Sequence, residues 1–134
     1  MQQHPHAHWA AALATLIVVA CGGSYGGADM STGPNTPATP APVQTNTVKL
    51  ITSGGNRFEP ANVEVPVGTT VTFVWESGIH DVTSTGSPSF QSSGDPVSAP
   101  RSFPVTFTQP GTYTFYCSVH GSPNSGMRGT ITVR

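Results

Sequence analysis

The amino-acid sequence predicts an all-β protein, a two-sheet antiparallel sandwich of about seven to eight short strands. Three observations lead to this prediction. Apolar and polar residues alternate with a period of two in several short runs, as in strands with one buried face. Glycine and proline, at 15 and 13 of the 134 residues, interrupt these runs at short intervals. After residue 46, no apolar pattern has the period of a helix.

The first 20 residues are expected to form a signal peptide. Residues 9–20 are an apolar run of twelve, which is too short to span a bilayer at about 20 residues and suits a signal-peptide core. The run leads into Val18, Val19, Ala20 and Cys21, which resemble the lipobox of bacterial lipoproteins. By that resemblance the chain is cleaved before Cys21, which carries lipid. We therefore expect an exported protein, lipid-anchored to a membrane and facing the periplasm or the cell exterior.

Residues 21–46 are expected to form a flexible tether. The segment is dominated by Gly, Pro, Ser, Thr and Ala, and such a composition cannot bury enough apolar surface to fold. The folded domain is then expected at residues 47–134.

Within this domain the alternation identifies the strands in order. A first strand is expected near residues 48–52, and residues 83–100, rich in Ser, Gly and Pro, allow no firm prediction. Residues expected to face the core are, in chain order, Val63, Val65 and Val67; Val71, Phe73 and Trp75; Phe103, Val105 and Phe107; Tyr113, Phe115 and Cys117; Ile131 and Val133.

The last two strands frame a candidate metal site. A strand ending in Cys117 runs into a loop that carries His120 and Met127, and Gly129 opens the next strand. Two imidazoles and a thiolate in a plane, with a weak axial thioether, are the ligands of a blue-copper electron-transfer site. The second imidazole can come only from His80, because residues 47–134 contain two His, one Cys and one Met.

The domain resembles the cupredoxins of the plastocyanin, pseudoazurin and amicyanin kind. The resemblance rests on FEPANVEVPVGTTVTFVWES at residues 58–77, HDV at 80–82, and PGTYTFYCSVH followed by GMRGTITV at the end of the chain. It implies a Greek-key sandwich holding one type 1 copper that cycles between Cu(I) and Cu(II). Carried over by position, the metal ligands are His80, Cys117, His120 and, axially, Met127. The implied function is membrane-tethered electron transfer between redox proteins, by a monomer that is not an enzyme and has no catalytic residues.

Three positions depart from the family pattern. Six residues separate His120 from Met127, which is more than is usual in these families. Asp81 follows the first ligand where the family usually has Asn, which ties the two ligand loops together, so Asp81 ties them with a charge or not at all. Val119 stands where many plastocyanins have Pro, and it retains a backbone N–H that can reach the Cys117 sulfur.

Two other functions stay open. A copper-handling protein without redox shuttling would use the same ligands, and a metal-free interaction module would keep Cys117 as a buried core thiol. The charge distribution argues against two further functions. The five basic and six acidic residues are scattered without a run of either sign. We therefore expect neither nucleic-acid binding nor a polybasic membrane patch.

Overall fold

The structure is a computed structural model that describes residues 40–134. In this range the chain forms eleven strands and no helix, and so holds no helix long and apolar enough to cross a membrane. The strands are β1 (Val43–Gln44), β2 (Thr47–Ile51), β3 (Arg57–Glu59), β4 (Asn62–Val65), β5 (Thr70–Trp75), β6 (Ile79–His80), β7 (Thr83–Thr85), β8 (Val97–Ser98), β9 (Arg101–Thr106), β10 (Gly111–Ser122) and β11 (Ser125–Val133).

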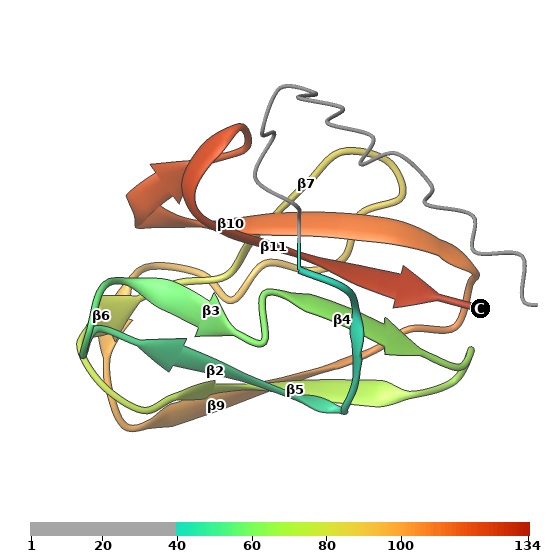
Figure 1. Cartoon of the computed structure of the whole chain (residues 1–134), viewed down its shortest axis with the longest axis horizontal. Coiled ribbons are helices and arrows are strands. Elements are labelled where there is room, and N and C mark those ends of the chain that lie inside the picture. The colour runs from blue at the N-terminus through green and yellow to red at the C-terminus, as the bar shows by residue number, and fades with distance from the viewer. Residues whose placement is uncertain (1–39) are drawn as a thin grey trace, which may run out of the picture. The chain divides into compact units, whose positions relative to one another are not determined.

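The strands form two main sheets (Figure 1). One has the order β1-β4-β11-β10-β7 and the other β3-β2-β5-β9, while β6 and β8 make a separate two-stranded pair. The all-β sandwich is thus confirmed. The number of strands is higher than expected because β1, β6 and β8 have two residues each and β3 and β7 have three, too few for an alternating pattern to reveal.

The sheets are mixed, which corrects the expectation of purely antiparallel pairing. β2 pairs in parallel with β5, and β4 pairs in parallel with both β1 and β11. The cause is the order of the chain. Between β2 and β5 it forms β3 in the same sheet and then crosses to the other sheet as β4, so that β5 returns beside β2 in the same direction.

The core lies between the two sheets and follows the predicted alternation closely. Phe115, at its centre, makes edge-to-face contacts with Phe58 and Phe73, with ring centroids 4.8 and 5.2 Å apart. Val67 is a wrong prediction: it is 47% exposed, because β4 ends at Val65 and the chain turns through Pro66. The predicted residues that are buried are Val63, Val65, Val71, Phe73, Trp75, Phe107, Tyr113, Phe115, Cys117, Ile131 and Val133, with Phe103 and Val105 partly buried.

The folded part begins before residue 47. Val43 and Gln44, expected in the tether, pair with Val63 and Glu64 as β1, and the Asn62 side chain donates to the Pro40 carbonyl at 3.1 Å. Val43 is largely exposed, so backbone pairing rather than burial holds this strand. The predicted signal peptide, Cys21 and most of the predicted tether lie outside the described residues.

Candidate metal centre

Three of the four predicted ligand residues meet at one end of the sandwich. His80 ends β6, while Cys117 and His120 lie in the distal half of β10. One ligand atom from each lies within 4.8 Å of the others. In Figure 1, β6 and the end of the β10–β11 hairpin lie at the same end of the fold. His80 and Cys117 are fully buried and His120 is partly exposed.

An irregularity in the β10–β11 hairpin places the fourth residue, Met127. Tyr116 pairs with Arg128, and the next pair is Gly121 with Gly126. Residues 117–120 on β10 therefore face Met127 alone on β11, which is a bulge of unusual size. Met127 is 3% exposed, so its side chain is buried beside the bulged segment of β10, which carries Cys117 and His120.

The same register corrects the expected loop. Instead of ending at Cys117, β10 continues to Ser122, and β11 begins at Ser125. The six residues between His120 and Met127 form the closed end of this hairpin, so Met127 lies opposite the bulge. Gly126 permits this because its φ is +73° and a Cβ there would meet the His120 carbonyl oxygen at 2.5 Å.

The spacing of the donor atoms fits a metal ion. The Cys117 Sγ lies 3.7 Å from Nδ1 of His80 and 3.5 Å from Nδ1 of His120. With metal–nitrogen and metal–sulfur bonds of about 2.0–2.1 and 2.3 Å, as at zinc, a trigonal centre holds N and S about 3.8 Å apart. The two imidazole rings lie with centroids 4.9 Å apart. A thiolate and two imidazoles are a donor set that suits copper.

Burial sets the protonation of two of these groups. Burial, and secondly the neighbouring His120, lower the pKa of His80, which keeps its imidazole neutral near pH 7 as metal binding requires. Burial raises the pKa of the Cys117 thiol, opposed by the backbone N–H groups of Asp81, Val119 and His120. A metal ion must therefore displace the thiol proton. The N–H of Val119 is thus one of the groups that lower the pKa of this thiol.

Asp81 ties the two ligand segments together, which confirms the first of the two possibilities for this position. Its carboxylate is 3% exposed and accepts from the backbone N–H and the hydroxyl of Ser118, both at 2.6 Å, and from the Thr83 hydroxyl at 3.1 Å. Asp81 follows His80 and Ser118 follows Cys117. The tie therefore fixes the distance between the two ligands' backbones.

Two residues that support His80 were missed as site residues. The Trp75 indole N–H donates to the His80 carbonyl at 2.8 Å, although the sequence suggested only a core role for it. The Thr52 hydroxyl lies 3.1 Å from Nε2 of His80. No pattern in the sequence indicates Thr52, since it lies 28 residues before His80 and only the pairing of β2 with β5 brings it there.

Comparison with known proteins agrees with this geometry. Plastocyanin of Scenedesmus fuscus is 37% identical over 98 residues, which cover 66% of this chain and 98% of that protein. Among solved structures, a purple cupredoxin from Nitrosopumilus maritimus matches with a TM-score of 0.54 and 29% identity, over 67% of this chain and 100% of that one.

A copper-containing nitrite reductase from Thermus scotoductus also matches, with a TM-score of 0.53 and 34% identity, over 72% of this chain but only 23% of the reductase. The family model described as copper binding proteins, plastocyanin/azurin family, matches residues 45–134. The chain therefore belongs to the plastocyanin/azurin family of copper-binding proteins.

Proposed function

We propose that this protein is a type 1 (blue) copper electron carrier, with His80, Cys117 and His120 as the equatorial ligands and Met127 as the axial ligand. The observation that carries the proposal is the placement of both Nδ1 atoms 3.5–3.7 Å from the Cys117 sulfur. Bound copper supplies a one-electron Cu(II)/Cu(I) couple.

The protein's own residues hold the ligands in place for this couple. Asp81 holds the segment after His80 against the residue after Cys117. Trp75 holds the His80 backbone from inside the core. Because these contacts come from the two sheets and do not depend on the charge of the metal, they favour one arrangement in both oxidation states, which keeps reorganisation small.

Electrons are proposed to enter and leave through the edge of His120. His120 is partly exposed, whereas His80 is fully buried. Next to the two histidines in the chain, Ile79 and Val119 are 52% and 50% exposed, and with Pro123 they would give redox proteins a small apolar surface to dock on. The partners would be redox proteins met by a monomer.

An electron carrier is favoured over an enzyme by the supply of ligands. Residues 40–134 contain two histidines, and both are used by the proposed site. A second metal centre for catalysis would have no imidazole in this range. The match to the nitrite reductase covers only 23% of that chain.

We also propose that the domain works outside the cytoplasm, anchored by lipid on Cys21. The support comes from the apolar run at residues 9–20 and the lipobox-like residues before Cys21. Labelling cells with a radioactive fatty acid tests the anchor. Label is expected on the wild-type protein and lost in Cys21→Ser, and a labelled Cys21→Ser protein contradicts the proposal.

The visible spectrum of the full chain tests the copper function. After Cu(II) is added and the excess removed, we expect an intense thiolate-to-copper band that ascorbate bleaches and ferricyanide restores. Cys117→Ser should abolish the band, and Cys21→Ser, which removes the only other thiol, should keep it. A colourless protein, or one that binds only Cu(I), would overturn the electron-carrier function in favour of copper handling.

A further inference from the structure

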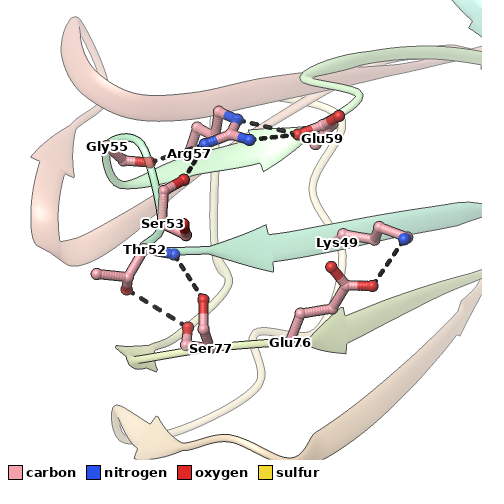
Figure 2. Close-up of polar contacts among 8 residues, drawn as sticks. All are labelled: Lys49, Thr52, Ser53, Gly55, Arg57, Glu59, Glu76 and Ser77. Atoms are coloured by element: carbon pink, nitrogen blue, oxygen red, sulfur yellow. Dashed lines mark hydrogen bonds and ion pairs between the residues drawn. The ribbon is translucent and has the colours of Figure 1, made fainter.

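Thr52 joins the end of β2 to the segment that delivers His80. Its backbone N–H donates to the Ser77 hydroxyl oxygen at 2.9 Å, and its own hydroxyl lies 3.4 Å from the Ser77 carbonyl oxygen. Figure 2 shows these two contacts side by side. The same hydroxyl oxygen lies 3.1 Å from Nε2 of His80. One side chain thus contacts both the backbone before His80 and its ring.

The neighbouring contacts fix Thr52 in this position. Just before Thr52 and Ser77 in the chain, the backbone N–H of Glu76 donates to the Leu50 carbonyl at 3.0 Å. On the surface of the same strand pair, Lys49 and Glu76 form an ion pair at 2.7 Å, which Figure 2 also shows. The hydroxyl of Thr52 is therefore presented to His80 from a residue that directly follows the β2–β5 pairing and is itself bonded to Ser77.

The contacts of the Thr52 hydroxyl connect it to the protonation of the His80 ring. The Ser77 carbonyl can only accept, so a hydroxyl that donates to it at 3.4 Å leaves its oxygen to accept from Nε2–H of His80 at 3.1 Å. A neutral imidazole has one N–H, so Nδ1 is left bare and faces the Cys117 sulfur. The opposite arrangement would place a proton on Nδ1, where the metal must bind.

We propose that the Thr52 hydroxyl is a positioning residue that holds His80 in the Nε2–H tautomer and thereby prepares Nδ1 for copper. This proposal rests on the ligand role proposed for His80. A partner on the outer nitrogen of a metal-bound histidine fixes its tautomer and ring orientation, and loss of such a partner costs about 10- to 100-fold in metal affinity.

Gly78 supports this role independently. Its φ is +80°, and a Cβ at this position would collide with the Thr52 hydroxyl oxygen and approach Nε2 of His80. Glycine therefore leaves open the space in which the hydroxyl and the ring nitrogen meet. The site as built has room for this hydrogen bond and for little else.

The test compares Thr52→Val, which keeps the side-chain shape but removes the hydroxyl, with Thr52→Ser, which keeps the hydroxyl. Thr52 is at an exposed strand end, and Thr52→Ala supplies a second variant without the hydroxyl. Thr70→Val is the matched control, because its hydroxyl bonds that of Thr106 at 2.8 Å at the far end of β5 from Trp75.

Two measurements on the full chain are needed. In the metal-free protein, ¹⁵N chemical shifts report which nitrogen of His80 is protonated, the signal being assigned by its loss in His80→Gln. Wild type, Thr52→Ser and Thr70→Val should show Nε2–H alone, and Thr52→Val a mixture of tautomers. Competition with a chelator should show Cu(I) binding about 10- to 100-fold weaker in Thr52→Val and Thr52→Ala and unchanged in the other two.

Two results would overturn the proposal. If Thr52→Val keeps Nε2–H alone and binds Cu(I) as wild type does, the Thr52 hydroxyl does not set the tautomer. If Thr52→Ser loses as much affinity as Thr52→Val, the hydroxyl is not the cause. A wild-type protein that binds no copper would instead refute the proposed function, and the tautomer comparison would still test Thr52.

Discussion

Replacing Asp81 tests whether the tie between the two ligand segments holds the site together. The carboxylate is buried and receives three hydrogen bonds, two of them from Ser118 at 2.6 Å. Asp81→Ala removes all three and leaves the Ser118 N–H without an acceptor. Asp81→Asn keeps one oxygen for that N–H, and its amide can donate to the Ser118 hydroxyl oxygen once the hydroxyl rotates.

The expected loss of stability follows from these contacts. A hydrogen bond to a charged group contributes about 1.5–3 kcal/mol, so the two short bonds sum to about 3–6 kcal/mol. Removing the carboxylate also removes the cost of burying it, so the lower end applies and we expect about 3 kcal/mol for Asp81→Ala. At about 4–8 °C per kcal/mol for a domain of this size, the melting temperature should fall by roughly 12–24 °C. For Asp81→Asn we expect about 1 kcal/mol.

The assay is thermal and urea unfolding of the metal-free chain, kept so with a chelator because bound copper would add its own stabilisation. Asp95→Ala is the matched control, since this carboxylate is exposed, and it should unfold as wild type does. If Asp81→Ala loses under about 1 kcal/mol, or if Asn is no better than Ala, the tie does not carry the stability argued here.

Three further predictions concern the ligands and their surroundings. Val119→Pro removes the N–H that acts on the Cys117 sulfur, so the reduction potential should rise by about 40 mV, the equivalent of about 1 kcal/mol; voltammetry showing an unchanged or lower value contradicts this. Met127→Leu keeps the packing but removes the thioether, so the potential should rise by tens of millivolts with the blue band retained; an identical spectrum and potential would exclude Met127 as axial ligand. In the metal-free protein, the lowered pKa of His80 reduces the free energy of unfolding as the pH falls below the ordinary value of 6.5. The raised pKa of Cys117 reduces it as the pH rises above the ordinary value of 9.0. The urea midpoint should therefore be highest between these pH values, and His80→Gln should weaken its decline on the acid side.

The buried faces could be predicted well, because the alternation of apolar and polar residues shows directly which side of a strand faces solvent. Tyr113, Phe115 and Cys117 are all buried as expected. Alternation does not record where a strand ends, which is why Val67 was placed in the core, nor the pairing of a two-residue strand such as β1. The parallel pairs depend on the chain crossing between sheets, which no local pattern encodes.

For the site, the sequence predicted the residue types but not the way they are brought together. His80, Cys117 and His120 were selected by scarcity and spacing, and the structure brings them within 4.8 Å of one another. The long spacing before Met127 does not move it away from the site, because the segment is a hairpin rather than a loop. In a hairpin, residues added in pairs at the closed end leave the pairing before them unchanged, so Met127 still faces the bulge.

Thr52 and Asp81 show why side-chain support of a metal site is harder to predict than its ligands. A ligand must be one of a few residue types, whereas a supporting hydroxyl or carboxylate can come from any segment that the fold brings near. Both supports act on positions that the ligands alone leave free, namely the outer nitrogen of His80 and the separation between the segments that follow His80 and Cys117. The spacing of Sγ and Nδ1 is thus held by the protein's own hydrogen bonds. A site held in this way resists any change of geometry that either oxidation state of copper would prefer for itself, and small reorganisation then follows from the fold rather than from the metal.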